Sequence, residues 1–207
     1  MNEHEFEPVP GLPAVLPQGE RILWQGAPVR RALARHAFHV RGVSLYFAAL
    51  LVWHGFSAGA SGAQGSQWLA ALAPTLLGAV IGLGILQLLA WLNARSTLYT
   101  LTNRRLVMRF GVAIPMTVNI PFSRLEAADL REHGDRTGDL ALTLGADSRI
   151  SYLVFWPHVR PWHFACAQPT LRAIAEPGRV ADLLRQAAVG STVETSGTAS
   201  EWASSAP

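Results

Sequence analysis

The stretch Ser96–Gly111, STLYTLTNRRLVMRFG, sets the fold of the C-terminal half of the chain. Two short runs rich in apolar and β-branched residues flank Asn103 and Arg104, a pair suited to a tight turn. A strand with one buried face needs an apolar side chain at every second position, and the second run provides it at Leu106, Met108 and Phe110. We therefore predict a β-hairpin with strands over residues 97–102 and 105–110.

A long apolar stretch precedes this hairpin. Residues 68–92, WLAALAPTLLGAVIGLGILQLLAWL, contain no charged residue, and a membrane-spanning helix needs about 20 such residues. Residues 42–61, GVSLYFAALLVWHGFSAGAS, form a shorter second candidate, and only a short uncharged loop separates the two. We predict a transmembrane helical hairpin with spans at about 42–61 and 68–92. The alternative is a buried helix pair of a soluble protein, but no other segment of the chain is comparably apolar.

The arginines indicate the orientation of the hairpin. All basic residues of the chain are arginines; they precede the first span and follow the second, and the connecting loop has none. The positive-inside rule then places both termini in the cytoplasm and the connecting loop outside. Basic side chains near the cytoplasmic ends and tryptophans near both membrane surfaces are the expected interface residues: Arg30, Arg31, Arg35, Arg41, Arg95, Trp53, Trp68 and Trp91.

The remaining pattern predicts a small α+β domain after the hairpin. Further strands are expected at 113–120, 123–131, 140–144, 149–155 and 170–175, followed by a helix over 177–189. Seven antiparallel strands and one C-terminal helix are typical of a pleckstrin-homology-like (PH-like) β-barrel or sandwich. The expected organisation is an extended leader (1–28), a basic juxtamembrane segment with the transmembrane hairpin (29–95), a cytoplasmic PH-like domain (96–189) and a disordered tail (190–207).

Composition excludes several classes of function. The net charge of +3 on 207 residues is too small to predict nucleic-acid binding, and a single cysteine permits neither an internal disulfide nor a paired-cysteine metal site. The chain carries no nucleophile elbow, phosphate-binding loop or zinc-protease motif. Asp135 and Asp139 lie in a turn cluster, where we expect them to shape turns. We therefore predict a binding protein without catalytic residues or metal.

Candidate binding residues fall in three regions. The segment WPHVRPWHF combines residue types that dominate protein interfaces, so Trp156, His158, Arg160 and Trp162 either contact a partner or cap the core. The strand region is basic and could meet anionic lipid or a protein partner through Arg104, Arg105, Arg109 and Arg124. In the spans, Gly78 and Gly82 permit close helix packing, within the hairpin or in a homodimer. His54 is a polar residue inside a span and therefore a candidate functional ligand, unless it is only an interfacial histidine beside Trp53.

Two resemblances add to these predictions. The segments TLYTLTNRRLVMRFGV and NIPFSRLEAADL resemble the pattern of bacterial PH-like domains. The leader EHEFEPVPGLPAVLPQGERILWQGAP, the segment RALARHAFHVR and the segment YLVFWPHVRPWHFACAQPTLRAI resemble the PuhB family of photosynthetic complex assembly proteins in purple bacteria. This second resemblance implies a chaperone-like role in assembling the photosynthetic reaction centre with its core light-harvesting antenna, whose subunits would be the partners. It also implies a location in the bacterial inner membrane or the intracytoplasmic photosynthetic membrane.

Three other functions remain open at this stage. A generic PH-like membrane scaffold or lipid sensor would need neither the leader nor the Trp-Pro-His segment. A chaperone that carries bacteriochlorophyll depends on His54. An enzyme of pigment biosynthesis lacks a candidate catalytic site in the sequence.

Overall fold

The computed structural model describes residue 12 and residues 15–145, 151–163 and 167–204, and the chain forms two compact units. One unit consists of residues 30–92. The other consists of the chain on both sides of that segment, up to Val29 and from Asn93 onwards. The sequence suggested the leader as a separate segment, but the part of it that the structure describes belongs to the same compact unit as the C-terminal domain.

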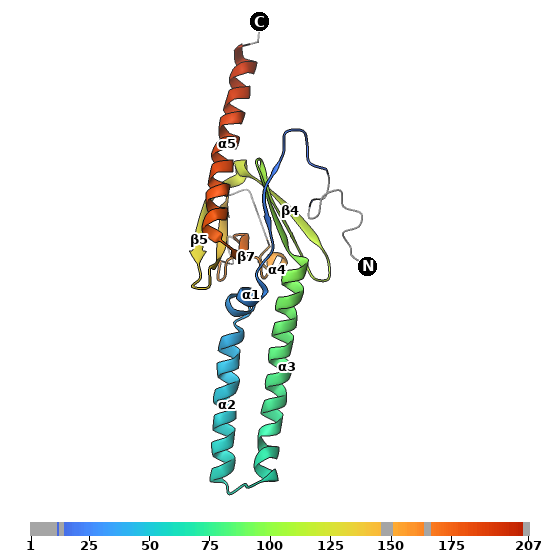
Figure 1. Ribbon diagram of the computed structural model, residues 1–207, viewed down its shortest axis with the longest axis vertical. Coiled ribbons are helices and arrows are strands. Elements are labelled where there is room, and N and C mark those ends of the chain that lie inside the picture. The colour runs from blue at the N-terminus through green and yellow to red at the C-terminus, as the bar shows by residue number, and fades with distance from the viewer. Residues whose placement is uncertain (1–11, 13–14, 146–150, 164–166, 205–207) are drawn as a thin grey trace. The chain divides into compact units, whose positions relative to one another are not determined.

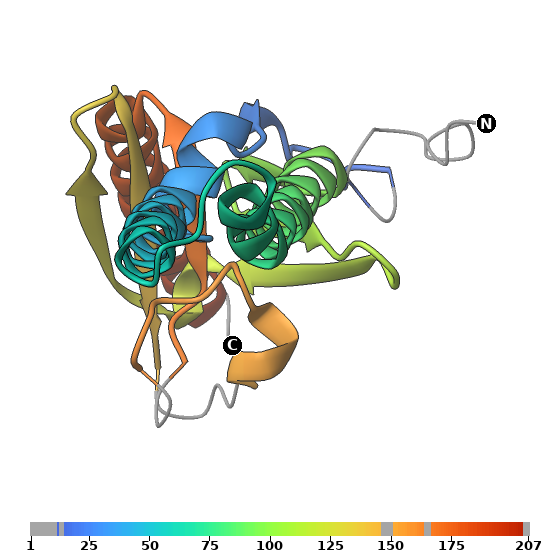
Figure 2. The ribbon, with the colours of Figure 1, turned by 90° about the horizontal axis from the view of Figure 1, so that it is seen from below.

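The unit of residues 30–92 is helical. It contains α1 (Arg30–His36), α2 (Val40–Ala60) and most of α3 (Ser66–Ser96), and α2 and α3 run side by side as a hairpin (Figures 1 and 2). At 1.5 Å per residue, α2 is about 30 Å long and α3 about 45 Å, against about 30 Å for a bilayer's hydrocarbon core. Both helices are long and apolar enough to cross a membrane. Each helix starts two residues before the predicted span, and α3 also ends four residues after it.

The first sheet contains the predicted hairpin and one strand that the sequence analysis missed. Its order is β1 (Ile22–Gly26), β2 (Leu98–Thr102), β3 (Arg105–Phe110) and β4 (Met116–Pro121), with every neighbouring pair antiparallel. Gly111 closes the β3–β4 turn at φ 119°, a backbone conformation that L side chains rarely adopt. Strand β1 comes from the leader, so residues on opposite sides of the apolar helices pair in one sheet.

The β2–β3 turn is also the place where the leader is attached. Thr102 Oγ1 accepts the backbone N–H groups of Arg104 (3.2 Å) and Arg105 (3.0 Å), which closes the turn. Asn103 binds leader backbone in both directions, accepting from Arg21 N–H (2.9 Å) and donating to the Gly19 carbonyl (3.0 Å). The Arg105 guanidinium makes two bonds to the buried Glu20 carboxylate, at 2.8 and 3.1 Å. The Thr-Asn-Arg-Arg sequence is therefore a binding site for the chain's own leader.

The second sheet and the C-terminal helix complete the domain. A short 3-10 turn, η1 (Phe122–Arg124), leads from β4 to an antiparallel sheet of β5 (Leu125–Glu132), β6 (Thr137–Leu144) and β7 (Thr170–Ala175), in that order. Helix α5 (Pro177–Ser204) packs against this sheet through Val180, Leu184 and Ala187 (Figure 1). Both sheets contribute to one core, to which Leu101, Met108, Leu140, Leu142 and Ile174 belong.

Four further details differ from the sequence prediction. The expected strand at 149–155 is wrong: Tyr152–Phe155 forms the helical turn α4, and residues 149–150 lie outside the described part. A short apolar run fits a strand and a helix equally well, and here the three-residue spacing of Tyr152 and Phe155 turns both toward the core. Because that strand is missing, the two sheets stay separate among the described residues and form no closed barrel.

The other two differences concern element ends. The strand expected from residue 113 begins only at Met116, after the turn at Gly111. Helix α5 continues to Ser204 through the segment predicted to be disordered, because extending a helix that packing has already started is far easier than starting one.

A chain of buried polar groups crosses the core between the two sheets. Tyr99 Oη, on β2, accepts the backbone N–H of Arg172 on β7 (3.2 Å) and lies 2.7 Å from His158 Nδ1. Since the hydroxyl has one proton, we assign it to the bond with Nδ1, which makes Nε2 the protonated nitrogen that donates to Thr97 Oγ1 (3.0 Å). His158 is fully buried and neutral in this arrangement.

Asp139 extends this polar layer. Its carboxylate accepts from the Ala173 backbone N–H (2.8 Å) and from the Arg172 guanidinium (3.0 Å), and His133 Nε2 lies 3.3 Å away. The expectation that Asp139 only shapes a turn is wrong, because it lies buried in β6 and binds β7. Burial, and to a smaller extent the Arg172 guanidinium, lower the pKa of His158 from 6.5 to about 3. Burial likewise raises the pKa of Tyr99 above its ordinary value.

The lowered pKa predicts an acid-dependent loss of stability. Below about pH 6.5 the unfolded chain binds a proton at His158 that the native chain refuses until about pH 3, so the free energy of unfolding falls as pH falls through this window. The loss should approach 1.4 kcal/mol per pH unit, and His158→Gln should remove that part of the slope. Denaturant unfolding of the full chain in detergent between pH 7 and pH 4 measures it. His163→Gln, at an exposed histidine nearby, is the control, and parallel curves for wild type and His158→Gln would contradict the prediction.

The Glu20–Arg105 pair predicts a second measurable effect. Glu20→Gln removes the charge that the half-buried Arg105 needs, which should destabilise β1 by about 1–3 kcal/mol and speed hydrogen exchange of the β1 amides at least about fivefold. Hydrogen–deuterium exchange of the full chain measures this effect strand by strand. Glu126→Gln makes the same change at an exposed position on β5 and should leave β1 unchanged. Equal exchange rates in the two variants would show that the pair does not hold the leader.

A candidate partner-binding surface

The segment between β6 and β7 is held firmly at its base. The Phe155 ring packs on the Phe110 ring with centroids 5.0 Å apart, and the His158 ring packs on Phe110 at 5.4 Å. The returning chain then pairs with the start of β7: the Thr170 N–H donates to the His158 carbonyl, and the Arg160 N–H donates to the Gln168 carbonyl, both at 2.9 Å. These contacts fix the backbone on which the neighbouring exposed residues stand.

Large apolar side chains project from this base. Leu153 and Trp162 are each 84% exposed, Trp156 is 50% exposed and Val154 is 45% exposed. We call these four residues the α4 surface. The sequence left open whether the tryptophans cap the core or face a partner. In the structure both tryptophans are exposed, and Phe155 and His158 are buried instead. Exposed apolar side chains of this size are typical of interaction sites.

Trp162 is held outward by an unusual backbone. Its φ angle is 66°, in the left-handed region that bulky side chains avoid. Such a conformation costs about 1–3 kcal/mol and persists only where the surrounding contacts impose it. The neighbouring Arg160 helps to impose it, because its guanidinium bonds Asp129 on β5 (2.7 Å) and Gln168 (3.0 Å). Arg160 thus fixes the loop to the second sheet, a role that the sequence did not predict.

His158 does not belong to the exposed surface, although the sequence grouped it with the two tryptophans. Its side chain is in the core, bonded to Thr97 and Tyr99. Conversely, Leu153 and Val154 were missed, because the segment was expected to be a strand. Their position just before a Trp-Pro pair is a signal that could have indicated a break in the sheet.

The arginines of the strand region are not brought together. Arg105 is committed to Glu20, while Arg104 in the same turn and Arg124 in η1 are exposed. Arg109 is half-buried at the opposite end of β3. The structure therefore offers exposed charge at two of the four positions rather than a continuous basic patch.

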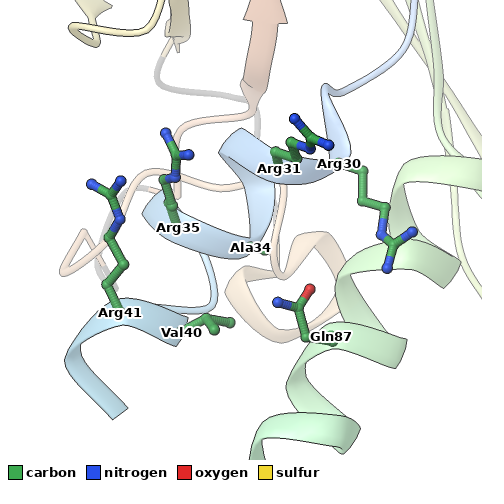
Figure 3. A pocket seen from close by; sticks show the side chains of 7 residues that line it. All are labelled: Arg30, Arg31, Ala34, Arg35, Val40, Arg41 and Gln87. Carbon is green, nitrogen blue, oxygen red and sulfur yellow. The ribbon is translucent and has the colours of Figure 1, made fainter. Parts of the chain in front are cut away.

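The arginines before the first span do come together. Arg30, Arg31 and Arg35 from α1 and Arg41 from α2 line one pocket, together with Ala34, Val40 and Gln87 of α3 (Figure 3). Arg95, near the end of α3, is exposed and lies outside this pocket.

The tryptophans of the helical hairpin differ in role. Trp68, at the start of α3, donates its indole N–H to the Gly55 carbonyl of α2 (2.9 Å) and so fastens the two helices together near their connecting loop. Trp53 is mostly exposed and Trp91 less so. Of the three predicted interface residues, Trp68 has a role within the hairpin that its sequence position alone did not suggest.

The small residues of α3 make room for the neighbouring helix. A Cβ atom added at Gly82 would touch the Phe47 ring of α2 at 3.5 Å, and one at Gly78 would touch it at 3.9 Å. The two glycines therefore allow the Phe47 ring of α2 to pack closely against α3 within the hairpin. His54 is exposed on α2.

Metal-binding clusters were searched for in the described part of the chain. There, no group of three or more His, Cys, Asp or Glu side chains lies close enough together to hold a metal ion. The buried polar layer around Asp139 combines a carboxylate with Arg172, whose positive charge disfavours a cation at that position.

Comparisons with known proteins agree with this architecture. The family model described as "Bacterial PH domain" matches residues 43–188. The chain is 43% identical over 197 residues to a protein of Rhodobacter capsulatus called "Uncharacterized 23.7 kDa protein in puhA 5'region", an alignment that covers 91% of this chain and 89% of that protein. No solved structure matches the chain. The match begins within α2 and covers α3, strands β2–β4 of the first sheet, the whole second sheet and the start of α5, but not β1, and the chain belongs to the bacterial PH domain family.

Proposed function

We propose that this protein is a non-catalytic assembly factor for the photosynthetic reaction centre and its core light-harvesting antenna. It anchors in the inner, photosynthetic membrane through α2 and α3 and binds subunits or assembly intermediates through its PH-like domain. The proposal requires no cofactor of its own. The single structural observation that carries the binding role is the α4 surface, where large apolar side chains stand exposed on a rigid base.

The relative's name supports the connection to photosynthesis. That protein is described by its position in the 5' region of puhA, which belongs to a reaction-centre gene region. The identity of 43% extends over 91% of this chain and 89% of that protein. A shared role in the same process is the simplest explanation of that similarity.

The sheet pairing supports the proposed topology. Strand β1 precedes the two apolar helices and β2 follows them, yet their backbones pair directly. If α2 and α3 cross the membrane, both flanks must therefore lie in the same compartment, as two spans allow. The arginines before α2 and after α3, against none in the connecting loop, favour the cytoplasm for that compartment.

The α4 surface suits a partner better than it suits water. Burying side chains of this size against a partner gains about 25 cal/mol per Å² of apolar area, and tryptophans are among the commonest energetic centres of interfaces. Because the loop is already fixed by Phe155, His158 and Arg160, a partner would not need to order it on binding. Rigid presentation of apolar groups is what a factor that holds an unfinished membrane complex requires.

A generic PH-like membrane scaffold is the competing function. The family match supports it directly, and it needs no contact with photosynthetic subunits. The two functions differ in what the loss of the gene does to pigment–protein complexes.

Loss of the gene is expected to reduce the reaction-centre and core-antenna bands in the near-infrared spectrum of the membranes, with pigment synthesis intact. The reason is that subunits without their assembly factor are degraded before they form a stable complex. The measurement compares membranes of the deletion strain before and after complementation with the full chain. An unchanged spectrum would contradict the assembly role and favour the scaffold.

Complementation also tests the α4 surface. The double variant Leu153→Ala, Trp162→Ala should fold normally, since both side chains are exposed, but it should restore the bands to less than about a tenth of the wild-type level; tenfold corresponds to about 1.4 kcal/mol of binding. Ile114→Ala, at an apolar side chain that is 77% exposed in the β3–β4 turn, is the matched control and should complement fully. Full complementation by the double variant at normal protein levels would remove the α4 surface from the mechanism.

A further inference from the structure

The pocket of arginines at the start of the helical hairpin has no role in the function proposed above. Its volume is about 440 Å³, within the range of about 300–1,000 Å³ that is usual for ligand sites. Arg30, Arg31 and Arg35 come from α1, Arg41 from the first turn of α2, and Gln87 from α3. Figure 3 shows Arg35 and Arg41 pointing the same way and the Gln87 amide pointing from α3 toward the other two helices.

The charge in this pocket is concentrated and of one sign. Residues 30–92 contain no Asp or Glu, so every acidic residue of the chain belongs to the other unit. These four account for a charge of +4, whereas the whole chain has +3, which leaves the rest of the chain at −1. Gathering like charges in one pocket is unfavourable unless an anion is bound there. Guanidinium groups and a side-chain amide are the donors that phosphate oxygens prefer.

The position of the pocket beside an apolar helix indicates which phosphate-containing molecule it would bind. Arg41 and Val40 begin the apolar helix α2, and the apolar side chains of that helix, from Leu45 onwards, follow directly along the chain. A ligand with a phosphate at one end and acyl chains at the other would match this order of charged and apolar surface. Basic pockets beside membrane helices bind the headgroups of anionic lipids for this reason.

We infer that Arg30, Arg31, Arg35, Arg41 and Gln87 form a binding site for the phosphate headgroup of an anionic phospholipid. The inference rests on the membrane placement proposed above but not on the assembly role. Inorganic phosphate shares the same chemistry, so the test must separate the lipid from the free ion.

The test measures lipid binding to the purified full chain in detergent. Phosphatidylglycerol is titrated while bound lipid is counted by native mass spectrometry and the thermal unfolding midpoint is followed. Phosphatidylcholine, whose phosphate is masked by a fixed positive charge, and sodium phosphate at millimolar concentration form the other two arms. We expect phosphatidylglycerol to bind and to raise the midpoint, phosphatidylcholine to do neither, and inorganic phosphate to leave the bound lipid in place.

Matched variants separate the pocket from general positive charge. Arg35→Gln with Arg41→Gln should weaken phosphatidylglycerol binding about 30-fold, since each arginine near an anionic headgroup is worth about 1 kcal/mol and 1.4 kcal/mol is tenfold. Arg104→Gln with Arg124→Gln removes the same charge from exposed positions of the other unit and should change nothing. Gln87→Leu alters the pocket without altering charge and should weaken binding about tenfold, so it keeps the test decisive if the arginine variant misfolds.

Three outcomes would overturn the inference: equal weakening in both arginine pairs, equal binding of phosphatidylcholine, or displacement of the lipid by inorganic phosphate. The assay contains no photosynthetic subunit, so its result is independent of the spectrum of the deletion strain. Lipid selectivity with an unchanged spectrum would contradict only the assembly role. A lost spectrum without lipid selectivity would contradict only this site.

Discussion

The ion pair between Glu20 and Arg105 joins two parts of the chain that the helical hairpin separates. With Thr102 and Asn103, it fixes the leader on the β2–β3 turn and so aligns β1 beside β2. Without β1, strand β2 would be an exposed sheet edge with unpaired backbone groups. The domain therefore depends on both ends of the hairpin returning to one place, and an even number of spans satisfies that requirement.

The Trp-Pro-His-Val-Arg-Pro-Trp segment divides its residues between two tasks. Phe155, His158 and Val159 point inward and tie the segment to the core, whereas Trp156 and Trp162 are exposed. The buried histidine is stable because every ring nitrogen has a partner, Tyr99 on one side and Thr97 on the other. A hydrophobic residue at position 158 would fill the space but leave the Tyr99 hydroxyl without its acceptor. The polar layer thus fixes the loop more specifically than apolar packing could.

The sequence predicted individual helices and strands better than it predicted which of them pair with each other. The helical hairpin, the β2–β3 hairpin and β7 follow from local periodicity, and those predictions are confirmed. Strand β1 was missed because its pairing with β2 joins residues about 80 positions apart, which no local pattern reveals. The helical turn α4 was mistaken for a strand because four apolar residues are too few to distinguish the two periods.

The sequence also identified the candidate sites only in part. Residue type identified the segment around Trp162 and the arginines before α2, but it could not say which side chains face outward. The sequence predicted that Arg105 and Arg160 contact a partner, but in the structure both form ion pairs with carboxylates of their own domain. By contrast, Arg30, Arg31, Arg35 and Arg41 line one pocket in a unit whose sequence contains no Asp or Glu. Arginines of one chain therefore divide into those that hold the domain together and those that can bind an anion, and the distribution of acidic residues decides which is which.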